Sequence, residues 1–175
     1  MERAVSWKIV IERGNLGFSA AHFITLNGIC EPLHGHNYGV RVEVIGALTD
    51  DALVLDFIAF KEIVRALCKD WDHRFLMPLD NPHLAVHSDP NEWEIRVDER
   101  TRYVLPRATV VPLPVDNVTT ERLAQQLAQR IAGMLAARGM DQQIERLTVG
   151  IEETEMQTAF YALALPHHPP GGPPT

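Results

Sequence analysis

Three histidines in the first quarter of the sequence are the residues best suited to chemistry. His34 and His36 flank a single glycine, and His22 ends the preceding segment FSAAH. Because residues i and i+2 of an extended segment point to the same side, His34 and His36 could bind one metal ion. His22 would complete a set of three imidazoles if its strand pairs beside residues 34–38. Three protein nitrogens with an open fourth position are typical of a catalytic zinc site.

Other metal centres fit these histidines less well. A cupin would place a carboxylate soon after the second histidine, whereas the first acid after His36 is Glu43. A binuclear zinc hydrolase would continue with Asp-His, whereas Asn37 and Tyr38 follow here. The remaining alternative is a loop in which each histidine is satisfied by hydrogen bonds, and the spacing favours a mononuclear site over it.

Four segments with alternating apolar residues are predicted to form the strands that position the histidines. Segments 6–12 and 38–46 alternate in the manner of half-buried strands, and we expect them to pair antiparallel around the loop that carries the chemistry. Segments 146–152 and 157–165 repeat the pattern near the end of the sequence. The strands therefore come in two pairs, one before and one after the central region.

Two segments with apolar residues at three- and four-residue spacing are predicted to be helices. The first covers 58–71 and has Asp56 as its expected N-cap. The second covers about 120–138 and is opened by Thr119 or Thr120. Their apolar stripes indicate that both helices cover one side of the sheet.

The region between the helices is harder to assign. Residues 83–114 are interrupted by prolines and are predicted to be an irregular excursion with short strands at 94–104 and 107–111. The proline- and glycine-rich tail 166–175 cannot build a core and is expected to be disordered. We therefore expect one folded domain over 1–165.

Composition narrows the class of protein. The chain has 175 residues, 46% of them hydrophobic and 22% charged, as in an ordinary globular domain. A net charge of -7 gives no general attraction for nucleic acid. No run is long enough for a membrane span, the N-terminus does not resemble a signal peptide, and the two cysteines make no disulfide framework. We expect a cytoplasmic protein with free thiols, of which Cys68 is a buried, inert part of the first helix.

Several motifs together resemble one known family, the 6-pyruvoyl-tetrahydropterin synthase and 6-carboxytetrahydropterin synthase group. They occur in the family's order and span most of the chain: FSAAH ending at His22, CEPLHGHNY at 30–38, LDF at 55–57, WDH at 71–73, VTTE at 118–121 and ET at 153–154. The resemblance implies an α+β tunnelling fold, in which a four-stranded antiparallel sheet is backed by two helices. It also implies homo-oligomers, trimers or hexamers, whose sheets close into a barrel with sites between subunits.

The resemblance also implies zinc as the cofactor, bound by His22, His34 and His36. Cys30 is implied as the general base, and a thiol beside cationic charge or a metal can supply thiolate at neutral pH. Glu31 stands beside Cys30, and one branch of the family that feeds folate synthesis uses a glutamate at this position. Either residue could therefore be the base.

The remaining implied site residues belong to two groups. Asp72 and His73 are implied as a carboxylate–imidazole dyad that relays protons. Glu153 is implied as the anchor of the pterin ring, because a carboxylate can accept two parallel hydrogen bonds from N–H groups. Thr119 and Thr120 are implied to add hydrogen bonds to the ring from a neighbouring subunit.

The implied activity is that of a lyase acting on 7,8-dihydroneopterin triphosphate. The product expected here is 6-carboxytetrahydropterin, a precursor in the queuosine and deazapurine pathway, with release of acetaldehyde and triphosphate. Formation of 6-pyruvoyl-tetrahydropterin or 6-hydroxymethyl-dihydropterin is the alternative within the family. A non-catalytic relative that binds zinc or a pterin is the alternative outside it. Lys8, Arg41 and Arg74 are available to bind the triphosphate.

Overall fold

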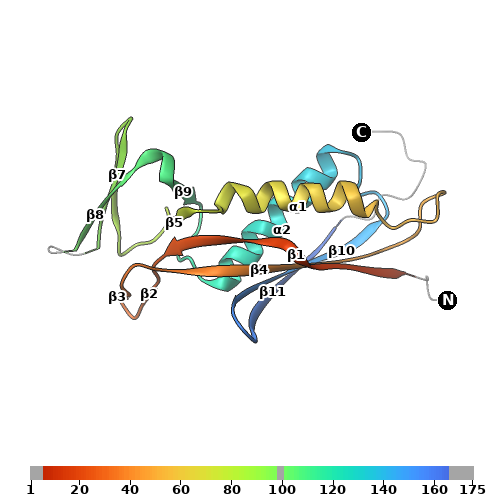
Figure 1. Cartoon of the computed structure of the whole chain (residues 1–175), viewed down its shortest axis with the longest axis horizontal. Helices are drawn as coiled ribbons and strands as arrows, with labels where there is room; N and C mark the ends of the chain where they lie inside the picture. Colours follow the sequence, from red (N-terminus) through yellow and green to blue (C-terminus); the bar gives the residue numbers. More distant parts are fainter. Residues whose placement is uncertain (1–5, 98–100, 166–175) are drawn as a thin grey trace.

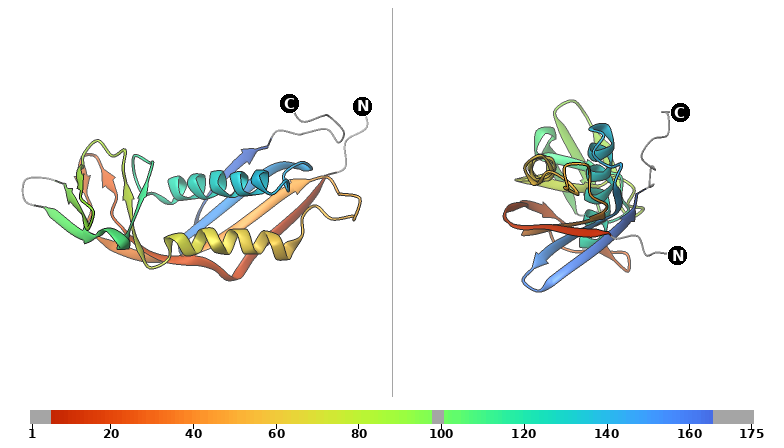
Figure 2. Two further views of the ribbon diagram at one scale, coloured as in Figure 1. Left: turned by 90° about the horizontal axis from the view of Figure 1, so that it is seen from above. Right: turned by 90° about the vertical axis from the view of Figure 1, so that its right-hand side faces the viewer.

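The structure is a computed structural model and describes residues 6–97 and 101–165. Two α-helices pack on one face of a long sheet, and a small second sheet lies at one end of the molecule (Figure 1). Figure 2 shows the two helices running side by side along the sheet. The expected disordered tail, 166–175, lies outside the described residues. Among the described residues, neither helix is both long and apolar enough to span a membrane.

The main sheet has six strands in the order β11-β10-β4-β1-β5-β9. Its four long strands are antiparallel neighbours: β1 (Trp7–His22), β4 (His34–Gly46), β10 (Ile144–Thr154) and β11 (Gln157–Ala164). Two short strands, β5 (Arg74–Pro78) and β9 (Val110–Leu113), extend it in parallel beside β1. The prediction of two antiparallel strand pairs is confirmed, whereas the prediction of only four strands is wrong. The strand β5 was missed because a parallel strand buried on both faces lacks the alternation of the long ones, whereas β9 overlaps the short strand predicted at 107–111.

The alternation in β4 produces the two faces of this sheet. Val40, Val42 and Val44 are buried beneath the helices, while Arg41 and Glu43 lie on the opposite face. The apolar face contributes to one large core that both helices complete. The predicted period of two is therefore confirmed in the strand that also carries two of the histidines.

The helices are α1 (Phe57–Trp71) and α2 (Thr120–Ala137). Both predicted caps are confirmed: the Asp56 side chain accepts a hydrogen bond from the Ile58 N–H at 2.8 Å, and the Thr119 side chain accepts one from the Arg122 N–H. The buried residues of α1 follow the predicted stripe: Phe60, Ile63, Val64, Leu67, Cys68 and Trp71. Burial raises the pKa of the Cys68 thiol to about 12, as expected for an inert cysteine.

The excursion is more regular than predicted. It forms a three-stranded antiparallel sheet from β6 (Ala85–Ser88), β7 (Glu92–Arg96) and β8 (Arg102–Pro106), followed by a short 3-10 turn, η1 (Arg107–Thr109). Short strand structure was predicted at 94–104, and the structure has two paired strands, β7 and β8, over this range, so the segment forms a sheet rather than isolated strands. A second apolar cluster joins this small sheet to the main one, with the buried members Phe23, Phe75, Met77, Ile95 and Val110. Burial from a distant part of the chain stabilises these strands, which local sequence could not reveal.

A short hairpin precedes β4 and carries Cys30. Its strands are β2 (Thr25–Leu26) and β3 (Ile29–Cys30), joined by a turn in which Asn27 and Gly28 both have positive φ. Glycine adopts such a conformation without steric cost, and asparagine is among the few other residues that tolerate it. The hairpin therefore reverses the chain between the two strands that bear the histidines.

Replacing Asp56 by alanine should lower the free energy of unfolding by about 0.5–2 kcal/mol, because the Ile58 N–H loses its capping acceptor. Urea unfolding followed by circular dichroism measures the change. Asp51→Ala is the matched control, since this exposed residue lies in the loop before the helix. An equal loss in both variants would show that charge, rather than capping, is responsible.

Candidate metal centre and active site

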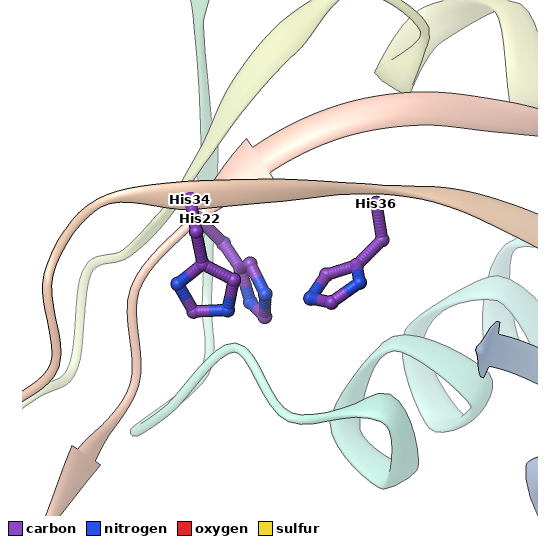
Figure 3. Close-up of side chains that lie close together, drawn as sticks. All are labelled: His22, His34 and His36. Carbon is purple, nitrogen blue, oxygen red and sulfur yellow. The ribbon is translucent and has the colours of Figure 1, made fainter.

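The three histidines meet where β1 ends and β4 begins. His22 is the last residue of β1 and pairs directly with His34, while His36 pairs with Ala20. One potential ligand atom from each histidine lies within 4.8 Å of those from the other two. Figure 3 shows the rings of His22 and His34 together, with the ring of His36 turned toward them. The histidines therefore lie on strand ends rather than in the loop, and antiparallel pairing brings them together.

Backbone carbonyls orient two of the rings. The Nδ1 atom of His22 lies 2.9 Å from the Val118 carbonyl oxygen, and the Nδ1 atom of His34 lies 2.8 Å from the Pro32 carbonyl oxygen. A nitrogen that donates to a carbonyl carries the proton, so the Nε2 atom of each neutral ring keeps a lone pair for a metal. Burial lowers the pKa of His22, which keeps that ring neutral. Three neutral imidazoles in this arrangement fit zinc.

Two further side chains approach the histidines. The Glu153 Oε1 atom lies 3.6 Å from the Nε2 atoms of both His22 and His36. The Tyr38 hydroxyl lies 3.2 Å from His22 Nε2 and donates a hydrogen bond to Glu153 at 3.4 Å. Burial, with the nearby carboxylate, raises the pKa of Tyr38, so the hydroxyl keeps its proton. Sequence analysis missed Tyr38, although its place two residues after His36 on the same face was the available signal.

A cavity beside this cluster brings together the three residues that the resemblance assigns to the pterin. Glu153, Thr119 and Thr120 line a cavity of about 510 Å³ with residues of the β10–β11 turn and the start of β11. All three come from one chain. The threonines were expected to reach the ring from a neighbouring subunit. No second subunit is needed to bring them close to Glu153.

Cys30 and Glu31 lie on and just after β3, and both are partly buried. The Cys30 side chain packs against the second apolar cluster, and its Sγ atom donates to the Glu31 carbonyl oxygen at 3.4 Å. The Glu31 N–H donates to the Ile24 carbonyl oxygen at 2.9 Å, which closes the hairpin. Cys30 is not a member of the histidine cluster, and it is therefore not a candidate metal ligand.

Asp72 and His73 form the predicted dyad, with His73 Nδ1 2.9 Å from Asp72 Oδ2. The Ser19 N–H donates to Asp72 Oδ1 at 2.7 Å, which is the main reason why the pKa of Asp72 is lowered. The His73 ring is 82% exposed and lines a cavity of about 460 Å³ together with Ser19 and Asn37. Ser19 and His22 are three positions apart along β1, so their side chains lie on opposite faces of the strand. His36 lines the same cavity as His73, but neither Asp72 nor His73 belongs to the histidine cluster.

Two of the three candidate cations lie away from the histidine cluster. Lys8 and Arg41 form ion pairs with Glu43, and Lys8 pairs with Ile45 near the start of β1, far along the strand from His22. Arg74 lines the cavity beside His73 and donates to the Ala108 carbonyl oxygen at 2.6 Å. Of the three, Arg74 alone lies beside a predicted catalytic residue.

Comparison with known proteins identifies the family. Residues 13–163 match the family model described as 6-pyruvoyl tetrahydropterin synthase. The chain belongs to this family. It is 31% identical over 147 residues to a protein of Methanocaldococcus jannaschii whose name assigns it provisionally as a 6-carboxy-5,6,7,8-tetrahydropterin synthase, and the match covers 83% of this chain and 89% of that protein.

Solved structures of family members have the same fold. The crystal structure of 6-pyruvoyl tetrahydropterin synthase from Plasmodium vivax is 26% identical and superposes with a TM-score of 0.86, covering 92% of this chain and 99% of that chain. A second P. vivax structure is described as a mutant in which a catalytic glutamate is replaced by alanine; it is 25% identical, with the same coverage and TM-score. Because the uncovered 8% is shorter than segment 83–114, most of the excursion is shared with the P. vivax enzyme.

His34→Ala should abolish stoichiometric zinc binding, because two histidines cannot hold the metal as three do. His34 is exposed, so its replacement should leave the fold intact. Metal analysis of protein purified with added zinc, together with circular dichroism, makes the measurement. His87→Ala, which changes an exposed histidine of β6, is the control. Full zinc content in folded His34→Ala protein would remove His34 from the ligand set.

Proposed function

We propose that this protein is a zinc-dependent lyase that converts 7,8-dihydroneopterin triphosphate and water to 6-carboxytetrahydropterin, acetaldehyde and triphosphate. The observation that carries the proposal is the cluster of His22, His34 and His36, in which carbonyls leave the Nε2 atoms of two rings available for a metal. The choice of product is supported by the name of the M. jannaschii relative. The product places the enzyme in the queuosine and deazapurine pathway of the cytoplasm.

The metal and the protein contribute different parts of the chemistry. Bound zinc would act as a Lewis acid toward the oxygen atoms of the substrate side chain, which makes the neighbouring C–H and O–H groups more acidic. Cys30 would accept a proton from the activated side chain, since its hairpin directly precedes His34. His73, oriented by Asp72, would relay protons on the other side of the substrate.

The cavity of about 510 Å³ is the proposed pterin site. Its size suits a bicyclic ring with a few polar contacts, which Thr119, Thr120 and Glu153 would supply. In the present structure the Glu153 carboxylate accepts a hydrogen bond from the Tyr38 hydroxyl. Pterin N–H groups would therefore compete with Tyr38 for this carboxylate, and a bidentate interaction with the ring is the stronger of the two.

The position of the dyad supports an active site shared between chains. Asp72 and His73 do not belong to the histidine cluster, and we therefore assign the dyad and the metal ligands of one site to different chains. The outer strands β11 and β9 end the main sheet on either side. Exposed strand edges favour pairing with other chains, and closure of sheets into a barrel would satisfy them. We propose that a trimer, or a hexamer of two trimers, brings the dyad of one subunit to the metal centre of another.

A second product is favoured by one specific observation. The related P. vivax enzyme has a catalytic glutamate, and this chain offers Glu31 directly after Cys30. Because successive side chains of an extended segment point to opposite sides, Cys30 and Glu31 would present different bases to the substrate. Abstraction by Glu31 would favour 6-hydroxymethyl-dihydropterin or 6-pyruvoyl-tetrahydropterin over the carboxy product. A non-catalytic role would instead leave a bound pterin unchanged.

Incubation of zinc-loaded protein with 7,8-dihydroneopterin triphosphate should yield 6-carboxytetrahydropterin and acetaldehyde, detected by mass spectrometry. Protein carrying His34→Ala is the control for metal-independent breakdown. A pyruvoyl or hydroxymethyl pterin would move the protein to another branch of the family. Unchanged substrate, with zinc bound and a pterin detected in spectral titration, would support the non-catalytic role.

Cys30→Ala should lower the rate of product formation about 10²- to 10⁴-fold while zinc content stays at the wild-type level, because a base is lost and no ligand is removed. Glu31→Gln, which keeps the size of the side chain, is the matched comparison. Steady-state rates of the two variants decide between the bases. An unchanged rate in Cys30→Ala with a large loss in Glu31→Gln would assign the base to Glu31.

A further inference from the structure

One dipeptide, Asn117-Val118, holds both ends of a short segment that links the metal centre to the hairpin carrying Cys30. At one end, the Val118 carbonyl oxygen accepts a hydrogen bond from the Nδ1 atom of His22, with 2.9 Å between the two atoms. At the other end, the side chain of Asn117 bonds the main chain of Thr25. His22 and Thr25 are only three residues apart, so the segment between them is fixed from both sides.

The Asn117 side chain binds Thr25 in the way that a neighbouring strand would. Its Oδ1 atom accepts the Thr25 N–H at 3.1 Å, and its Nδ2 atom donates to the Thr25 carbonyl oxygen at 2.8 Å. The same Oδ1 atom also accepts the Val118 N–H at 3.2 Å. Only a carboxamide offers a donor and an acceptor side by side for this pattern.

The dipeptide itself is rigidly held. Val118 is fully buried in the main core, and the next residue, Thr119, caps α2. The Arg122 guanidinium binds the Asp116 carboxylate through two hydrogen bonds of 2.8 Å, which fixes the other side of the dipeptide. The position of α2 is thereby transmitted to His22 and Thr25 together.

Apart from Cys30, which packs against the second apolar cluster, the hairpin has little packing to fix its position. Each of its strands has two residues, and its apolar side chains Leu26 and Ile29 are 62% and 71% exposed. An isolated two-stranded hairpin is marginally stable in water. Contacts at Thr25, which pairs with Cys30 across the hairpin, therefore matter more here than in a longer ladder.

We infer that Asn117 is a positioning residue that sets the hairpin bearing Cys30 and Glu31 relative to the metal ligand His22. Its effect on catalysis rests on the proposed function, whereas its effect on the hairpin does not depend on any activity. Coupling of this kind is reciprocal, so occupation of the metal centre must also steady the hairpin.

Asn117→Ala tests this inference, with Asn81→Ala as the matched control. Asn81 is a buried asparagine that, like the half-buried Asn117, is bonded to Thr25, but it reaches only the side-chain hydroxyl, at 2.8 Å, and its replacement leaves the main-chain clamp intact. Chelator competition measures zinc affinity, and amide hydrogen exchange measures opening of the hairpin at Glu31, whose N–H closes it. Asn117→Ala should weaken zinc about 10- to 100-fold, as other residues that orient metal ligands do, and should speed exchange at Glu31. Asn81→Ala should change neither by more than about threefold.

Wild-type zinc affinity and exchange in Asn117→Ala, or equal losses in both variants, would overturn the inference. If Asn117→Ala does not fold, Asn117→Asp decides, because it keeps the shape and the acceptor but loses the Nδ2 donor to Thr25. Wild-type protein provides an independent measurement: zinc should slow exchange at Glu31, and no change would count against the coupling. If wild-type protein binds no zinc, the proposed function fails, while exchange in the zinc-free variants still decides the role of Asn117.

Discussion

The antiparallel register of β1 and β4 is the constraint on which the candidate metal centre depends. It places His22 opposite His34 and Ala20 opposite His36. A slip of one residue would turn one strand's histidines to the opposite face and leave no cluster. The strands approach so closely at Gly17 that a Cβ atom there would lie 2.4 Å from the Tyr38 carbonyl oxygen. Glycine at this position is thus part of what brings the paired segments together.

The same face of β4 has two chemical roles because the helix layer does not extend to its end. In the main core that face carries Tyr38, Val40, Val42 and Val44, and beyond the core it carries His36 and His34. The period of two is unbroken, so one strand connects the apolar core directly with the metal centre. Core packing therefore restricts the positions of the histidines without a separate scaffold.

Local patterns predicted the parts of the molecule that depend on local physics. The alternation of β4, the cap at Asp56 and the pairing of the histidine segments are all properties of short stretches of sequence, and the structure has each of them. The sheet at 85–106 could not be predicted in this way, because Ile95 is buried by Phe23 and Phe75 from a different part of the chain. The clamp by Asn117 was equally hidden, since its partner Thr25 is 92 residues away in sequence.

The position of the Asp72–His73 dyad follows from the way in which α1 ends. Asp72 is the C-cap residue, and His73 then adopts a positive φ of 56° before the chain enters β5 alongside β1. Two hydrogen bonds hold this conformation against β1: the Ser19 N–H donates to Asp72, and the His73 N–H donates to the Ser19 carbonyl oxygen at 2.6 Å. A left-handed conformation is unfavourable for histidine and persists where surrounding contacts impose it. These contacts hold the dyad against β1 at Ser19, so the end of α1, rather than the β1–β4 register, determines where the His73 ring lies.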